Sequence, residues 1–249
     1  VIREMAGART PVALLPLGTA NNIARTLGVV GDARVMAAGW RLAAVQPFDV
    51  GVLGARWGER RFVEAVGGGI FAESIILGRS EIAEPTSILS PESDRAMLLL
   101  REVVRAARPA SWQIEVDGED LSGDYLAVEV MNIRFAGPNV PLAPDADPGD
   151  GLLEVVLIGE QHRRALLDHL SGRLEQASAL PPELEVRRGR HIRLLPVPIG
   201  PPIRVDDDVL GIEIDLSGEV VADADDPLEI SLEPGAVKLL GGAPHSARG

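Results

Sequence analysis

The sequence predicts an α+β protein in which a partial α/β layer is followed by a β-rich sandwich. In the opening third, segments with helical spacing alternate with an apolar strand, which is typical of an α/β layer. After Gln46, short apolar segments alternate with glycine and proline turns, which favours a sandwich or barrel. The 249 residues are 46% hydrophobic, enough to bury the core of one large domain or two small ones.

The first part contains short elements. Residues 2–6 have a helical pattern, and the apolar segment 11–17 (PVALLPL) is expected to be a buried strand. The next segment, NNIARTLG, combines an asparagine cap, a short helix and a stop at Gly28. A second helix is expected over residues 32–45, where apolar residues recur three and four positions apart.

The second part is expected to consist of strands and two helices. Residues 47–69 are interpreted as two strands joined by a glycine-containing turn, and 111–135 as a hairpin that turns at DGED. Helices are expected over 93–107, which is amphipathic and should lie against the sheet, and over 161–177. Further strands are expected within 151–159, 184–195, 202–208 and 227–234.

Composition excludes several classes of protein. The net charge of −13 argues against nucleic acid as a partner, because affinity for nucleic acid comes mostly from neutralised phosphates. The single lysine, Lys238, does not follow a P-loop pattern. The absence of cysteine excludes disulfides and thiolate metal sites and predicts a reducing compartment. No apolar segment approaches the roughly 20 residues that span a bilayer, and no signal peptide is visible, so a cytoplasmic protein is expected.

The turn Gly18-Thr19-Ala20-Asn21-Asn22 is a candidate phosphate site. A helix that starts here leaves backbone N–H groups without partners, and its dipole favours an anion. Gly18 allows close approach of the backbone, and Thr19 adds a hydroxyl donor. The alternative is an ordinary asparagine-capped turn between a strand and a helix.

Two acidic segments are candidates for further chemistry. Asp145, Asp147 and Asp150 lie within six residues in a Pro/Gly loop before a strand, and such a loop can offer carboxylates and carbonyls to Mg²⁺. Near the end, VDDDVLG (205–211) and LSGEVV (216–221) place carboxylates on turns, where one could accept a proton from a hydroxyl. Plain solvated turns are the alternative for both segments.

In their order and spacing, six motifs resemble the lipid kinase family that includes the bacterial diacylglycerol kinases and the sphingosine kinases. The motifs are PLGTANNIAR (16–25), FDVG (48–51), FVEAVGGGIFAE (62–73), MNIRFAGP (131–138), APDADPGDGLLEVVLI (143–158) and PLEISLEPGAVKLL (227–240). The resemblance implies the fold that this family shares with NAD kinases. Residues 1–45 would be the C-terminal part of an α/β nucleotide-binding domain, 46–235 a β-sandwich domain for lipid and metal, and 236–249 a C-terminal segment.

The resemblance also implies a nucleotide site. Gly18, Thr19, Asn21 and Asn22 match the family's ATP-contacting turn, in which Asn22 replaces the usual aspartate. Asp49 of FDVG matches an aspartate that links this site to the rest of the fold. The family's Gly-Gly-Asp-Gly-Thr signature is not among these residues and is expected upstream, because the sequence opens on Val1 in the middle of a helical pattern. We therefore expect this stretch alone to be inactive and to bind ATP poorly or not at all.

A metal site and a general base are implied as well. Asp150 matches the side chain that holds Mg²⁺, with the carbonyls of Asp147 and Leu152 beside it, and this loop is expected to share one cleft with Thr19. Asp208 and Glu219 are alternatives for the base that takes the proton of the substrate hydroxyl.

The implied activity is ATP- and Mg²⁺-dependent transfer of the γ-phosphate to a lipid hydroxyl of a diacylglycerol-like or sphingoid substrate. The lipid chains are expected in an apolar groove beside the helix 93–107, with transient contact to a membrane surface. Two alternatives remain open. One is a catalytically silent lipid-binding or regulatory relative, which Asn22 suggests, and the other is an NAD kinase-like enzyme with a soluble substrate.

Overall fold

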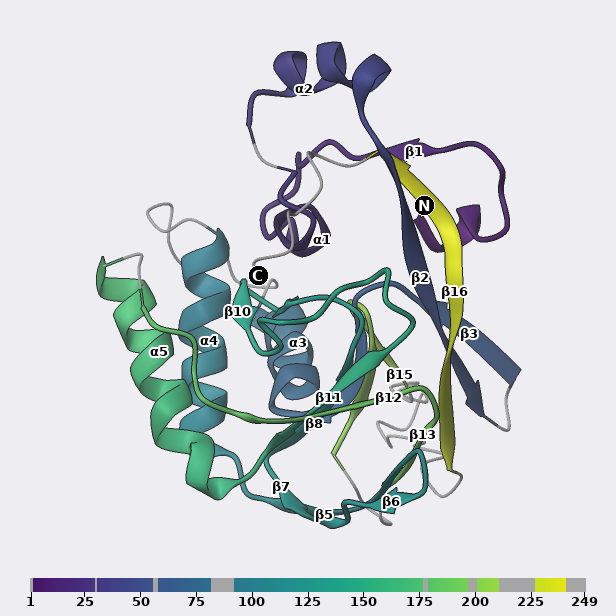
Figure 1. Ribbon diagram of the computed structural model, residues 1–249. Helices are drawn as coiled ribbons and strands as arrows, with labels where there is room; N and C mark the ends of the chain where they lie inside the picture. Colours follow the sequence, from purple (N-terminus) through teal and green to yellow (C-terminus); the bar gives the residue numbers. More distant parts are fainter. Residues whose placement is uncertain are drawn as a thin grey trace.

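Two antiparallel sheets packed face to face form the body of the protein, as the computed structural model in Figure 1 shows. The structure describes residues 2–29, 31–55, 58–81, 92–176, 179–196, 201–210 and 227–240. This architecture confirms the α+β class predicted from the sequence, with a sandwich after a short mixed N-terminal part.

The larger sheet has the strand order β3-β2-β16-β13-β5-β6, with β1 paired to β16 and β7 paired to β5. Its strands are β1 (Val12–Ala13), β2 (Val45–Ala55), β3 (Gly58–Phe62), β5 (Ala110–Val116), β6 (Glu119–Asp120), β7 (Gly123–Tyr125), β13 (Ile192–Pro196) and β16 (Leu228–Leu240). All pairs in this sheet are antiparallel except β1 with β16.

The smaller sheet has the order β12-β11-β8-β4-β14-β15 and carries the acidic residues described below. Its strands are β4 (Ala65–Gly69), β8 (Ala127–Met131), β11 (Leu153–Ile158), β12 (Glu185–Gly189), β14 (Ile203–Val205) and β15 (Asp208–Leu210). A separate small ladder joins β9 (Phe135–Ala136) to β10 (Val140–Pro141).

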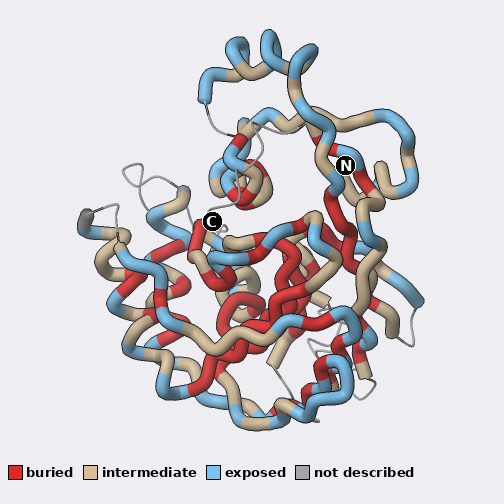
Figure 2. The backbone as a smooth tube through the Cα atoms, viewed as in Figure 1, coloured by how far each residue is buried: buried red, intermediate tan, exposed pale blue. Residues whose placement is uncertain are grey.

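Alternating side chains of the smaller sheet build two cores. One face meets the larger sheet, where Val128 and Val155 pack with Leu53 and Trp112. The other face is covered by α3 (Ile70–Glu81), α4 (Glu92–Ala106) and α5 (Arg163–Gln176). Burial on both faces explains why β8 and β11 are apolar apart from one buried glutamate each, Glu129 and Glu154. Figure 2 shows these strands buried at the centre of the molecule.

The N-terminal part packs on one end of the larger sheet. It contains η1 (Ile2–Met5), α1 (Asn22–Thr26), α2 (Ala33–Gly39) and η2 (Trp40–Leu42). Ile23 and its neighbours pack against Phe48 of β2 and Val237 of β16. α2 stands away from the body in Figure 1 and has no buried residue.

Several expected elements differ from the observed ones. The strand predicted over 11–17 is only two residues long, and the helix predicted over 32–45 ends at residue 42 because Val45 already pairs with Leu240. Residues 47–69 contain parts of three strands rather than two. β16 continues through the expected boundary at 235/236, with a bulge between Glu233 and Val237.

Other expectations agree with the structure. The hairpin turn at DGED joins β5 to β6, and the helices expected at 93–107 and 161–177 are α4 and α5 with η3 (Glu160–His162) before the latter. The sequence reasoning did not predict α3. Within the described ranges, no helix is long and apolar enough to cross a membrane.

Candidate active site

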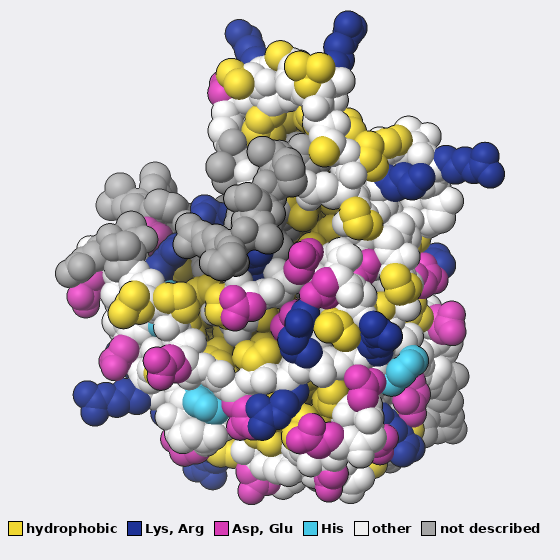
Figure 3. Space-filling view, viewed as in Figure 1, with side chains coloured by type: hydrophobic (Ala, Val, Ile, Leu, Met, Phe, Trp, Pro, Cys, Tyr) yellow, Lys and Arg dark blue, Asp and Glu magenta, His cyan; other side chains and the backbone are white. Residues whose placement is uncertain are grey.

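A cavity of about 700 Å³ lies between the N-terminal part and the helices α3 and α4. Most of its wall is apolar, with side chains such as Leu14, Ile23, Ile75 and Leu99. Figure 3 shows hydrophobic side chains where the N-terminal part meets the body of the protein. The cavity lies beside α4, where an apolar groove was expected, and its occupation by lipid chains stays a prediction.

Two carboxylates line this cavity, Glu64 and Asp207, and since the charge of Asp207 acts on Glu64 we call their corner the acidic end. Asn22, Asn139, Arg79 and Arg95 line the cavity as well. A smaller hollow adjoins it, because Glu64 and Asp207 line both spaces. The cavity therefore combines an apolar wall with an acidic end, as a binding site for an amphiphilic molecule requires.

Gly18, Thr19, Asn21 and Asn22 all line the cavity, and their role in binding ATP stays a prediction. Asn21 has φ +53° and does not cap the helix with its side chain. Its Oδ1 instead accepts a hydrogen bond from the Gly18 amide at 3.0 Å, which closes the turn on itself. Because α1 has only five residues, its dipole is a weak basis for binding an anion.

Asn22 connects the turn to the body of the protein. Its side chain is buried, and its Nδ2 donates to the Glu64 carboxylate at 3.4 Å and to the carbonyl of Gly137 at 3.2 Å. Within the described ranges, its Oδ1 is buried without a hydrogen-bond partner. Asn22 thus places a neutral amide against the carboxylate at the acidic end.

Glu64 lies in the two-residue connection between β3 and β4, and its backbone is held on both sides. The carboxylate of Asp206 accepts hydrogen bonds from the amides of Val63, Glu64 and Ala65, the shortest being 2.8 Å. Asn132 donates its own amide to the Glu64 carbonyl at 2.9 Å. These contacts fix the point from which the Glu64 side chain enters the cavity.

The environment of Glu64 raises its pKa to about 7. Burial is the main cause, and the charges of Asp207 and Asp206 act in the same direction. The hydrogen bond from Asn22 and the charge of Arg204 oppose this effect without cancelling it. Glu64 therefore exchanges a proton near neutral pH, which suits a general base.

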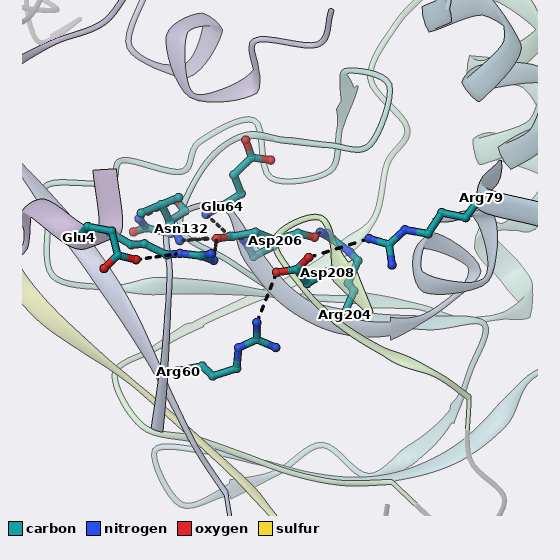
Figure 4. A network of polar contacts seen from close by, with 11 residues as sticks. Glu4, Arg60, Glu64, Arg79, Asn132, Arg204, Asp206 and Asp208 are labelled. Carbon is teal, nitrogen blue, oxygen red and sulfur yellow. Dashed lines mark hydrogen bonds and ion pairs between the residues drawn. The ribbon is translucent and has the colours of Figure 1, made fainter. Parts of the chain in front are cut away.

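A buried ion pair between Arg204 and Glu129 lies next to the acidic end and holds the backbone of Asp206. Arg204 of β14 donates from Nε and Nη2 to the two carboxylate oxygens of Glu129 at 3.1 and 2.7 Å, and both side chains are almost fully buried. Its Nη1 donates to the carbonyl of Asp206 at 2.8 Å. Figure 4 shows how Arg204, Asp206 and Glu64 follow one another in this network.

Of the two predicted bases, the structure describes only Asp208. Asp208 lies at the edge of the adjoining hollow, about half exposed, and its carboxylate pairs with Arg60 at 3.3 Å and with Arg79 at 3.9 Å. Glu219 lies outside the described residues.

Sequence reasoning assigned no role to Glu64, Asp206 or Asp207. The signal for Glu64 was present, because it is a lone acid between the apolar residues of FVEAV. Asp206 and Asp207 belong to the VDDD segment, and the sequence alone did not show which of its three aspartates has which role.

Asp49 and Asp150 lie at a different hollow, which Gly235 and His191 also line. The buried carboxylate of Asp49 accepts from the amides of Gly151 at 2.7 Å and Gly235 at 2.6 Å, so it ties β2 to the acidic loop and to the bulge of β16. Burial raises the pKa of Asp49, the two amides lower it, and the charges of Asp150 and Asp147 raise it.

The acidic loop is closed by its own contacts. Asp150 accepts from the Leu152 amide at 3.0 Å and forms a short ion pair with Arg188, while the carbonyl of Asp147 accepts from the Asp150 amide at 3.3 Å. Arg188 also pairs with the buried Glu154, whose pKa is raised to about 7 chiefly by burial.

The donors of this loop suit a hard cation in type, since they are carboxylate and carbonyl oxygens with mutually repelling charges. Among the described residues, however, no three acidic or histidine side chains converge on one point, so a cation would need backbone oxygens and the release of Arg188.

The structure does not bring Thr19 and Asp150 to one cavity within the described ranges. Thr19 lines the large cavity, and Asp150 lines the hollow at Asp49. The Nδ2 of Asn132 donates to the carbonyls of Asp49 and Val63 and so joins β2 to the connection between β3 and β4. The turn and the acidic loop thus line different hollows of the described residues, and a polyphosphate shared by both stays a prediction.

Comparison with known proteins identifies the family. Residues 81–241 match the model of the YegS C-terminal NAD kinase beta sandwich-like domain, and residues 1–53 match that of the diacylglycerol kinase catalytic domain. The chain belongs to the bacterial diacylglycerol kinase and YegS-like lipid kinase family. This confirms the resemblance drawn from the six motifs.

Individual relatives agree with this assignment. The chain is 30% identical over 156 residues to a Pseudomonas putida protein named "Probable lipid kinase YegS-like", covering 62% of the chain and 49% of the relative. It is 26% identical over 151 residues to the diacylglycerol kinase of Bacillus subtilis, covering 60% of the chain and 47% of the relative. The chain thus spans about half the length of these curated relatives.

A solved structure shares the fold. A diacylglycerol kinase from Bacillus anthracis superposes with a TM-score of 0.61 at 18% identity, covering 94% of this chain and 70% of the other.

Proposed function

We propose that this protein is a lipid kinase that transfers the γ-phosphate of ATP to a hydroxyl of a diacylglycerol-like or sphingoid lipid. The observation that carries the proposal is the cavity itself, which joins an apolar wall to an acidic end beside the turn Gly18–Asn22. A soluble substrate such as a dinucleotide would not need the apolar wall, so this observation favours a lipid.

The proposed arrangement assigns each side of the cavity a role. The lipid chains lie along α3 and α4, and the lipid hydroxyl lies at the acidic end. The phosphates of ATP approach from the turn at Gly18 and Thr19, because transfer requires the donor phosphate and the hydroxyl to meet in line. Transient contact with a membrane surface would let the lipid enter the cavity.

Mg²⁺ is proposed for the loop of Asp147, Asp150 and Leu152, next to Asp49. When bound, the ion would supply positive charge that offsets the crowded carboxylates. Since this loop lies apart from the large cavity, we assign it the role of stabilising the junction of β2, β11 and β16.

The test is phosphate transfer by the full-length gene product from labelled ATP to diacylglycerol or sphingosine in mixed micelles. Ala96→Trp places a bulky side chain at a solvent-exposed cavity position on α4. We expect this variant to lose at least about tenfold in kcat/KM for the lipid, because part of the apolar wall is filled.

Ala106→Trp on the same helix is the matched control, since residue 106 is exposed and does not line the cavity. Activity should be unchanged in this control. If the wild-type protein transfers phosphate to no lipid hydroxyl, the proposed function is wrong. If Ala96→Trp and Ala106→Trp behave alike, the cavity is not the lipid site.

A further inference from the structure

We propose that Glu64 is the group that accepts the proton of the substrate hydroxyl. The inference rests on the proposed function and deepens it, because it names the base within the acidic end. Glu64 lies at the boundary between the large cavity and the adjoining hollow, whereas Asp208, one of the two bases expected from the sequence, lines only the hollow.

The position of Glu64 suits a base that serves a hydroxyl in the cavity. Glu64 lines both spaces, whereas Asp208 lines only the adjoining hollow and not the large cavity. The backbone of Glu64 is fixed by Asp206 on one side and Asn132 on the other. A base must be held within hydrogen-bond reach of the hydroxyl it serves, and a fixed backbone at the polar end meets this requirement.

Asn22 is the hydrogen-bond partner of the Glu64 carboxylate. Its Nδ2 donates to this carboxylate at 3.4 Å. Because the amide is neutral, the hydrogen bond orients Glu64 without cancelling its charge, so the carboxylate can still accept a proton.

Charged groups from several elements surround Glu64. Asp206 and Asp207 from the β14–β15 turn face Glu64, and Arg204 from β14 is the cation that acts on it. Arg79 from α3 donates to the carbonyl of Asp207, and Arg3 from the N-terminal part pairs with Asp206 at 3.6 Å. The same Arg79 also lies 3.9 Å from the carboxylate of Asp208, which pairs with Arg60 as well, so two guanidinium groups engage Asp208 directly.

Proton transfer to Glu64 accompanies the transfer of the phosphoryl group. The carboxylate of Glu64 takes the hydroxyl proton as the lipid oxygen forms a bond to the γ-phosphorus of ATP. The bond between this phosphorus and the β–γ bridging oxygen breaks, and ADP leaves with the electron pair. The products are the phosphorylated lipid, ADP and a protonated Glu64, which returns its proton to water.

The experiment compares Glu64→Gln, Glu64→Asp and Asp208→Asn in the full-length gene product, over pH 5 to 9. We expect the wild-type kcat to fall below about pH 7, where Glu64 becomes protonated. Glu64→Gln should lose about 100-fold or more in kcat with little change in the KM for the lipid, which is the range of general-base catalysis. Glu64→Asp should keep part of the activity and move the acid limb to lower pH.

Asp208→Asn should lose far less activity and keep the wild-type acid limb. The exposed Glu102→Gln on α4 serves as a control for the loss of one negative charge. Urea unfolding establishes whether each variant is folded. If Glu64→Gln does not fold, the comparison of Glu64→Asp with the wild type tests the proposal.

The inference is overturned if folded Glu64→Gln keeps its activity, or if the acid limb disappears in Asp208→Asn instead. It is also overturned if the pH limb of Glu64→Asp stays at the wild-type value. A wild-type protein that binds lipid but transfers no phosphate would overturn the proposed function as well, and would identify a silent relative.

Discussion

At the scale of single residues, Glu64 makes stability depend on pH. A carboxyl whose pKa is raised from 4.5 to about 7 on folding binds its proton more tightly in the folded state than in the unfolded state. Its ionisation therefore opposes folding. The resulting loss of stability is absent below about pH 4.5, develops as the pH rises, and is complete above about pH 7.

Glu64→Gln should remove this dependence. At pH 8 we expect the variant to be more stable than the wild type by up to about 3 kcal/mol, and at pH 4 the two should be nearly equal. The measurement is urea unfolding at a series of pH values, with the exposed Glu102→Gln as control. Identical pH slopes for the wild type and Glu64→Gln would contradict the buried, ionisable Glu64 described here.

The separate roles of Asp206, Asp207 and Asp208 could not be predicted from the sequence. It selected VDDD as chemically important, but the roles within that segment depend on the turn. Asp206 has φ +52°, and its carboxylate accepts hydrogen bonds from the amides between β3 and β4. The next residues, Asp207 and Asp208, face the cavity and the arginines instead. Three identical letters carry no information about this difference.

At the scale of elements, the register of three strands explains the buried ion pair. Gly67 of β4 lies opposite Arg204 of β14 on one side and Glu129 of β8 on the other. Because Gly67 has no side chain, Arg204 and Glu129 can meet across the middle strand. A Cβ at Gly67 would lie 2.4 Å from the Glu129 carboxylate, so this position requires glycine. The ion pair in turn holds the carbonyl of Asp206.

Arg204→Met should therefore destabilise the protein by about 3–5 kcal/mol, because it leaves the carboxylate of Glu129 buried without its partner. Arg193→Met is the matched control, since Arg193 forms an exposed pair with Glu229 at 3.1 Å and should contribute under about 1 kcal/mol. Urea unfolding near neutral pH measures both. If both variants lose the same free energy of unfolding, the buried pair contributes no more to stability than the exposed one.

Elements with a clear period were predictable, and elements set by their partners were not. α4 and α5 were expected because of their length and spacing. α3 was missed because it begins in a continuous apolar run, IFA, which follows three glycines and is equally compatible with a strand. β2 begins at Val45 rather than after a longer helix, because β16 offers it a partner up to Leu240. That partner lies almost two hundred residues away and leaves no local signal.

At the scale of the whole molecule, the family's motifs are distributed over two spaces rather than one. The turn at Thr19 and the acids around Glu64 belong to the large cavity, whereas Asp49 and Asp150 belong to the hollow beside β16. The order of the motifs in the sequence predicted the fold correctly, because topology follows chain order. It could not predict which carboxylates share a space, since that depends on contacts between segments far apart in the sequence, such as those of Asp49 with Gly235 and of Asp206 with Glu64.

This separation leads to a prediction for Mg²⁺ that does not depend on catalysis. In the acidic loop the Arg188 guanidinium already compensates Asp150 and Glu154, so a cation must compete with it. Arg188→Gln should strengthen Mg²⁺ binding, and Asp150→Asn should abolish it. A ligand present at ten times its dissociation constant stabilises a fold by about 1.4 kcal/mol, which thermal unfolding with and without millimolar Mg²⁺ can detect.

The expected order of the Mg²⁺-dependent increase in Tm is Arg188→Gln above wild type above Asp150→Asn. Asp94→Asn is the matched control, because Asp94 is an exposed acid of α4 outside this loop, and it should respond like the wild type. If Tm is insensitive to Mg²⁺ in all four proteins, Arg188 is the permanent cation of this loop. The junction of β2, β11 and β16 would then be stabilised by an internal ion pair in place of a metal.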